Sequence, residues 1–195
     1  MNWQDGIKYW RLLDALKNGD DCIILQELGK FAALGEDYSS FDIGMTYEEE
    51  LSLPRNLEMA IRWYERGAIC EQDRRCYFAL ARIFYYGSLE VSEDLVKSFD
   101  FFKRASMLGS HEASIILVEN IQRGIFPVQS EVFLQKTLRP AVRAGYVTAM
   151  RLSAAISRRN GQNLRANLLG FLAWLCEILI TRRDNSDPRL YLVER

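Results

Sequence analysis

Few residues of this 195-residue chain have the chemistry of a catalytic group. His111 is the single histidine and stands beside a predicted helix start, where a surface or capping role is typical. The four cysteines are irregularly spaced and do not form the pattern of a zinc site. Glu48, Glu49 and Glu50 are consecutive, so on a helix their carboxylates point in different directions. The sequence therefore predicts no catalytic residue, no metal site, no cofactor and a protein that is not an enzyme.

Charge is distributed unevenly along the chain, although the formal net charge is only −1. Residues 31–54 contain six acidic residues and no Lys or Arg, whereas residues 132–176 contain seven basic residues and no Asp or Glu. Such fields steer association and select partners, while uneven surface charge without a role is the alternative interpretation. The low net charge argues against nucleic-acid binding by bulk charge. The basic residues are Lys136, Arg139, Arg143, Arg151, Arg158, Arg159 and Arg165.

An internal repeat organises the chain. Similar segments start at Ser39, Cys76, Ala113 and Ala149, which are 37, 37 and 36 residues apart. This period accommodates two helices and two turns, and the four prolines of the whole chain are few enough to favour helix. One such unit cannot bury its apolar face alone, so neighbouring units are expected to stack. Small residues are expected where two helices approach closely: Gly44, Ala60, Ala81, Ser98 and Ala144.

The pattern predicts a single helical-repeat domain over residues 1–195. Its expected parts are a degenerate helix pair (1–35), three repeat units (36–72, 73–109 and 110–145), a C-terminal helix pair (146–181) and a tail (182–195). The expected helices from the first repeat onward cover about 38–50, 57–69, 75–86, 94–107, 112–124, 130–144, 147–159 and 163–181.

The last predicted helix is unusually apolar for the end of a repeat array, where an outer face is normally polar. Its most apolar run, Leu168–Ile180, is 13 residues long and contains Glu177, whereas a membrane span needs about 20 apolar residues. We therefore expect a buried or interface helix without a membrane span. It would be covered either by the tail, through Leu190, Tyr191 and Val193, or by a second copy in a homodimer.

The repeat resembles that of Sel1-like repeat proteins, which are relatives of the tetratricopeptide repeat. The resemblance covers about Ser39–Gly145 and implies a right-handed α/α solenoid of antiparallel helix pairs, with about four to five units here. It also implies protein binding through a concave face and no catalytic activity. The first unit carries it on Ser39, Ile43, Gly44, Tyr47, Leu53, Pro54, Asn56, Ala60, Trp63, Tyr64 and Ala68; the second on Cys76, Leu80, Ala81, Phe84, Gly87, Val91, Asp94, Ser98, Phe101, Phe102, Ala105 and Gly109.

The resemblance also implies which residues contact a partner, because the first helix of each pair lines the concave face in related repeats. Tyr and Arg are residue types that dominate interface energies, so Tyr85 and Tyr86 are the expected hot spot. Packing against the next unit is the competing interpretation for these two tyrosines. The expected partner-binding residues are Met45, Glu48, Glu49, Arg82, Tyr85, Tyr86, Glu119, Gln122, Arg123, Arg158 and Arg159.

The sequence thus predicts a non-enzymatic module that grips a protein partner. Within this class a bacterial immunity protein that neutralises a cognate toxin is the favoured hypothesis, and a general scaffold or regulatory adaptor is its competitor. Nucleic-acid binding through Arg158 and Arg159 is the alternative from another class. The N-terminal sequence lacks the pattern of a secretory leader and the cysteines are interpreted as reduced thiols, so a cytoplasmic location is expected.

Overall fold

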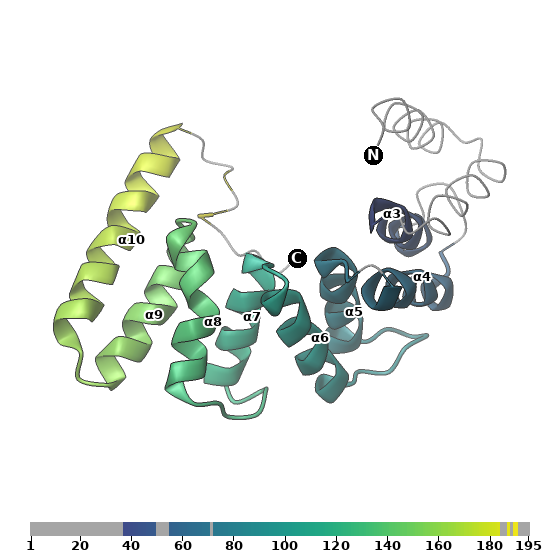
Figure 1. The fold of residues 1–195 in the computed structure, drawn as a ribbon, viewed down its shortest axis with the longest axis horizontal. Helices are drawn as coiled ribbons and strands as arrows, with labels where there is room; N and C mark the ends of the chain where they lie inside the picture. Colours follow the sequence, from purple (N-terminus) through teal and green to yellow (C-terminus); the bar gives the residue numbers. More distant parts are fainter. Residues whose placement is uncertain (1–36, 50–54, 71, 184–186, 188, 191–195) are drawn as a thin grey trace. The chain divides into compact units, whose positions relative to one another are not determined.

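The computed structural model describes residues 37–49, 55–70, 72–183, 187 and 189–190, and every regular element among them is an α-helix. The predicted all-α class is therefore confirmed (Figure 1). The expected helix pair of residues 1–35, together with Glu50, Leu53 and Pro54 of the first unit and Tyr191 and Val193 of the tail, lies outside the described residues. The helices are α3 (Asp37–Glu48), α4 (Leu57–Cys70), α5 (Arg74–Tyr86), α6 (Leu95–Met107), α7 (His111–Gln122), α8 (Glu131–Arg143), α9 (Val147–Arg159) and α10 (Asn163–Arg183).

The chain divides into two compact units, Met1–Phe101 and Phe102–Arg195, which are described one at a time. In the first unit α3 packs on α4, and both contact α5. In the second unit α7 contacts α8 and α9, α8 packs on α9, and α9 packs on α10. Contacts between consecutive helices are typical of a helical-repeat solenoid, in which each pair stacks on the next.

Close helix packing in the first unit depends on small residues. A Cβ atom added at Gly44 of α3 would lie 2.4 Å from Cε1 of Tyr64, whose side chain is fully buried on α4. Ala60 and Ala81 are buried, and the buried Ser98 hydroxyl donates a 2.9 Å hydrogen bond to the carbonyl of Ala81. These four small residues are therefore confirmed at close contacts. Ala144 differs, because it caps the C-terminus of α8 and is only half-buried.

Aromatic rings fill the spaces between helices within each unit. In the first unit the rings of Phe84 and Phe101 stack at 5.8 Å, and Tyr77 lies 6.2 Å from Phe101. In the second unit the ring of Phe102 lies 6.1 Å from that of Phe126, and both side chains are buried. The aromatics thus supply much of the apolar surface that the helices bury.

Side chains cap the starts of α4 and α6. Oδ1 of Asn56 accepts a 3.0 Å hydrogen bond from the Met59 amide, and Oδ1 of Asp94 accepts one of 3.0 Å from the Lys97 amide. Asp94 therefore caps α6. Such caps satisfy amide groups that have no partner within the helix.

The tail docks on the second unit through Leu190, as predicted. This side chain is buried beside Val147, Met150 and Ala173, at the contact between α9 and α10. The amide of Val147 also donates a 3.1 Å hydrogen bond to the carbonyl of Arg189, which fixes the tail at the start of α9. Leu190 therefore covers the side of α10 that faces α9.

Candidate protein-binding surface

Three of the predicted partner-binding residues, Glu48, Arg82 and Tyr86, lie together in the first unit. They line a hollow of about 140 Å³. Glu48 ends α3, whereas Arg82 and Tyr86 are four residues apart on α5 and so share one face of that helix. We call this hollow the Tyr86 surface. It is lined by Glu48, Arg55, Leu57, Arg82, Ile83, Tyr86, Gly87 and Ser88.

The carboxylate of Glu48 is held from two sides. The hydroxyl of Tyr64 donates a 2.7 Å hydrogen bond to Oε2, and the Arg82 guanidinium lies 3.5 Å from Oε1. Burial, followed by the nearby Glu48 carboxylate, raises the pKa of Tyr64 well above its usual range, so Tyr64 stays a neutral donor. Glu48 is thereby oriented at the edge of the Tyr86 surface.

Tyr86 is the exposed member of the tyrosine pair, with 58% of its surface accessible. Its ring lies 4.9 Å from that of Tyr85 in an edge-to-face contact, and Tyr85 is half-buried. A tyrosine presents a large contact area at a small entropic cost, because it has few rotatable bonds. Within the pair, Tyr86 is therefore the side chain available to a partner, and Tyr85 supports it.

A second hollow, of about 480 Å³, shares Arg55 with the Tyr86 surface. Arg55, Asn56, Glu58 and Ile61 line it from the start of α4, and Glu90 and Val91 line it from the loop after α5. Oε2 of Glu90 accepts a 3.3 Å hydrogen bond from the Leu57 amide, which ties this loop to α4. None of these residues is among the expected partner-binding residues, because Glu58 and Ile61 lie on the second helix of their pair and Glu90 and Val91 lie in a loop.

The remaining predicted residues are scattered. In the first unit Met45 is half-buried and Glu49 is exposed. In the second unit Arg123 forms a 2.6 Å ion pair with Glu119 one turn earlier on α7, and Arg158 is exposed at the end of α9. Gln122 and Arg159 line a hollow of about 330 Å³ beside Ile121, Leu134 and Ile156.

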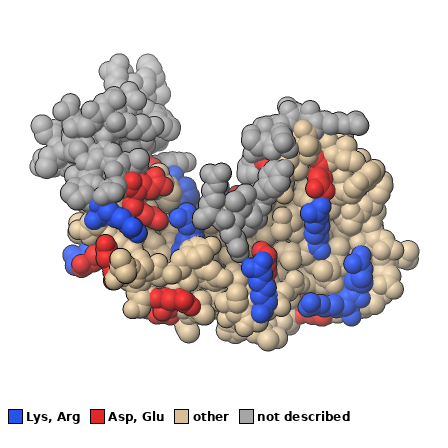
Figure 2. Space-filling model, turned by 180° about the vertical axis from the view of Figure 1, so that it is seen from behind, with Lys and Arg blue, Asp and Glu red and all other residues tan. Residues whose placement is uncertain are grey.

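Basic residues of the second unit do not form one continuous surface in the view of Figure 2, which shows separate groups of Lys and Arg with Asp and Glu among them. The guanidinium of Arg151 pairs with the carboxylate of Glu177 at 2.7 Å. Arg165 lies 3.4 Å from the amide oxygen of Gln135. Some of these arginines therefore have polar partners, although residues 132–176 contain no acidic residue.

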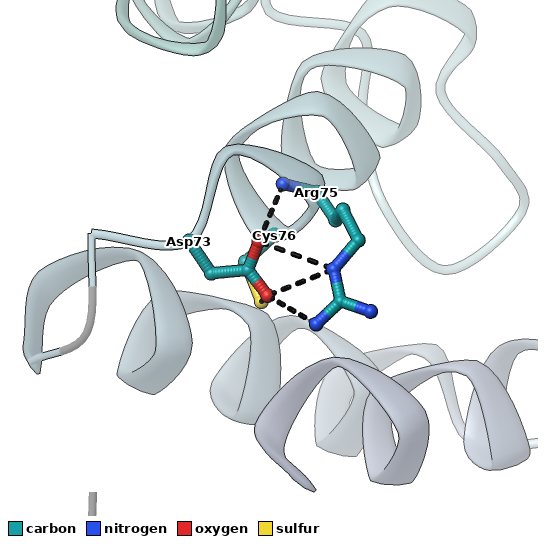
Figure 3. Close-up of polar contacts among 3 residues, drawn as sticks. All are labelled: Asp73, Arg75 and Cys76. Atoms are coloured by element: carbon teal, nitrogen blue, oxygen red, sulfur yellow. Dashed lines mark hydrogen bonds and ion pairs between the residues drawn. The ribbon is translucent and has the colours of Figure 1, made fainter. Parts of the chain in front are cut away.

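Polar contacts link Asp73, Arg75 and Cys76 at the start of α5 in the first unit (Figure 3). Asp73 caps α5 by accepting a 2.8 Å hydrogen bond from the Arg75 amide, and it pairs with the Arg75 guanidinium at 2.7 Å. The same guanidinium lies 4.5 Å from the Phe41 ring, and Sγ of Cys76 lies 3.9 Å from Oδ2 of Asp73. Burial raises the pKa of Asp42 to about 6, and Asp73 adds to the rise whereas Arg75 opposes it.

Asp42→Asn is expected to stabilise the protein at pH 8 by about 1 kcal/mol and to have little effect at pH 4. The folded carboxyl, with a pKa of about 6 against an ordinary 3.8, holds its proton more tightly than the unfolded one. The free energy of unfolding therefore falls as the pH rises from about 4 to 6, and the asparagine side chain, which does not titrate, removes this pH dependence. The expected gain of about 1 kcal/mol is smaller than the pKa shift alone would give, because the carboxyl is partly exposed to water. Urea unfolding at both pH values measures the difference, with Glu58→Gln as the exposed control. An equal effect of Asp42→Asn at both pH values would contradict the account.

The segments that form the candidate surface match a known family. The family described as Sel1 repeat matches residues 38–70 and 74–110. The chain contains two Sel1 repeats. The first Sel1 repeat includes α4 and nearly all of α3, and the second contains α5 and α6, so Glu48, Arg82 and Tyr86 lie inside the matched segments. The resemblance inferred from the repeat pattern is confirmed.

Two solved structures share the fold of this chain. One is a Sel1 repeat protein from Oxalobacter formigenes, with a TM-score of 0.63 and 17% identity over 77% of this chain. The other is a protective antigen present in uropathogenic Escherichia coli strains that displays an SLR fold, with a TM-score of 0.60 and 16% identity over 86% of this chain. The chain spans 62% and 38% of those two chains, respectively. No curated protein matches this sequence.

The Sel1 repeats and the solenoid fold indicate a general class of function. Sel1 repeats are generally protein–protein interaction modules without catalytic activity. Among the described residues, no three His, Cys, Asp or Glu side chains are grouped so that they could hold a metal ion. The Sel1 repeats support the predicted class of protein-binding module; they do not identify the partner.

Proposed function

We propose that the chain binds a protein partner through the Tyr86 surface. The observation that carries the proposal is an exposed tyrosine beside an arginine and an oriented carboxylate, in a hollow within the Sel1 repeats. Tyrosine and arginine are the side chains most often found to dominate binding energy at protein interfaces. Glu48 and Arg82 are already placed by Tyr64 and by each other, which reduces the entropy that ordering them costs on binding.

The chemistry of the Tyr86 surface indicates the kind of segment that it accepts. Leu57 and Ile83 are buried beneath it, and Tyr86 provides an exposed ring, so an apolar side chain of the partner fits there. Arg55 and Arg82 are exposed at the same hollow, and guanidinium groups bind carboxylates well. We infer a partner segment that presents an apolar residue next to an acidic one.

The narrower role is an inhibitor that neutralises a cognate toxin, as in a bacterial immunity protein, with a scaffold or adaptor as the competitor. An inhibitor is expected to bind one partner tightly and in a fixed ratio, because it has to cover one active site. A scaffold is expected to bind several partners more weakly. Quantifying the proteins bound by the chain in its native host distinguishes these two roles.

An affinity pull-down from the native host tests the proposed function. The double variant Arg82→Ala/Tyr86→Ala removes two exposed side chains of the Tyr86 surface, and Ile69→Ala removes an exposed side chain elsewhere on α4. The expected result is a partner that copurifies with the wild type and with Ile69→Ala but not with the double variant. A partner that the double variant retains in full would place the binding site outside the Tyr86 surface.

Nucleic-acid binding is the second candidate function, because Arg158 and Arg159 are adjacent and exposed at the end of α9. It predicts an affinity that falls steeply as salt rises and that depends on these two side chains. Titration of labelled RNA and DNA with wild type and Arg158→Ala/Arg159→Ala at low and high salt measures both features. Negligible binding at low salt would exclude this function.

A further inference from the structure

Among the described helices, α10 carries the most exposed large apolar side chains. On its inner side α10 packs against α9 through Ala173, with Cys176 and Ile180 beside it. On other sides it exposes large apolar side chains, with exposed fractions between 37% and 89%. These residues are Leu164, Leu168, Phe171, Leu172, Trp174 and Leu179.

Apolar residues on this face follow the spacing of a helix–helix seam. Leu164, Leu168, Phe171, Leu175 and Ile178 succeed one another at intervals of four, three, four and three residues. That alternation is the signature of a helix that packs along a second helix, with side chains inserted between those of the partner. Five seam residues occupy most of the length of α10, so the seam offers a partner helix about four turns of contact.

A lipid bilayer fits this face less well than a protein does. The segment Asn163–Thr181 is long and apolar enough to cross a membrane. The shorter 13-residue run considered in the sequence suggested that length excludes a span, and the longer helix removes that argument. However, Glu177 lies in the same stretch and forms a 2.7 Å ion pair with Arg151 of α9, and both side chains reach water. A span would carry this charged pair into hydrocarbon, where ionised side chains are costly and therefore rare.

We propose that α10 is a homodimer interface, in which the seam of one chain packs on the same seam of a second copy. The seam contains no charged residue, so two identical faces meet without like-charge repulsion. Three seam side chains, Leu164, Leu168 and Phe171, are 89%, 58% and 56% exposed, so pairing of two copies would bury apolar surface that now faces water. A symmetric pair brings the same residues together at the two-fold axis, and Phe171 is at the middle of the seam.

Charge substitutions at Phe171 test this proposal in the full chain. Phe171→Glu and Phe171→Arg each place like charges against each other at the axis, so each is expected to weaken dimerisation by roughly 30-fold or more. An equimolar mixture of the two variants pairs opposite charges and is expected to regain the dimer. Val132→Glu is the matched control, because Val132 is also apolar and exposed but lies on α8.

Light scattering coupled to size-exclusion chromatography, together with circular dichroism, measures mass and helix content for all four proteins. The proposal predicts dimeric wild type and Val132→Glu, two monomeric Phe171 variants with unchanged helix content, and a dimeric mixture. A monomeric wild type would overturn it, as would dimers that persist in both Phe171 variants. Wild type that is monomeric in solution but binds vesicles of phosphatidylcholine and phosphatidylglycerol would assign the face to lipid instead.

Discussion

Gly44→Ala is expected to destabilise the protein by about 2–3 kcal/mol, the upper part of the ~1–3 kcal/mol that an extra methyl group costs in a close-packed core. The added Cβ would lie 2.4, 2.6 and 2.9 Å from three carbons of the Tyr64 ring, closer than real contacts allow. The ring has little room to move, because Tyr64 is fully buried and its hydroxyl is bonded to Glu48. Relief of the clash therefore requires α3 to shift away from α4.

Gly170→Ala is the matched control, because Gly170 also lies inside a helix but a Cβ there meets no atom within 4 Å. Alanine is the better helix former by about 1 kcal/mol, so this variant is expected to be as stable as wild type or slightly more stable. Urea unfolding followed by circular dichroism compares the three proteins. Equal stabilities of the two variants would show that α3 and α4 are not in the close contact described here.

Tyr86→Ala is expected to weaken partner binding by about 30-fold, which corresponds to the ~2 kcal/mol of an interface hot spot. The substitution removes the exposed ring from the Tyr86 surface but leaves the buried side chains of α5 in place. Arg82→Ala is expected to have a smaller effect of about tenfold, because its guanidinium is exposed and is shared with Glu48.

Isothermal titration calorimetry with the purified partner measures these affinities, and unfolding curves confirm that each variant is folded. Ile69→Ala, exposed on α4, serves as the control and is expected to bind within about threefold of wild type. If Tyr86→Ala binds as tightly as this control, the Tyr86 surface is not the binding site.

Helix positions are the part of the fold that the sequence predicts best, since local signals define them. The predicted helix 147–159 is α9 as observed, because Gly145 precedes it and Asn160-Gly161 follows it. The end of α3 was less predictable: the expected helix continued to Glu50, whereas α3 ends at Glu48. The residues after Glu48 carry no glycine or proline until Pro54, so no local signal marks that end.

The candidate surface is predictable only in part. The position of Glu48, Arg82 and Tyr86 within the repeat predicts them as partner-binding residues, because side chains at equivalent positions of a repeat are expected on the same face of the array. Repeat position does not predict Arg55, which reaches the same hollow from the start of α4, nor Tyr64, which orients Glu48 from inside the core. Both depend on contacts between residues distant in the sequence, and a periodic pattern does not encode such contacts.

The central claim is that a protein partner contacts Tyr86, and photo-cross-linking in the native host tests it most directly. A photoreactive phenylalanine analogue in place of Tyr86 keeps an aromatic ring there, and the same analogue in place of Ile69 probes another exposed position, on α4. We expect irradiation to join the chain covalently to one partner from position 86 and not from position 69. A partner that copurifies but cross-links from position 69 and not from position 86 would contradict the claim.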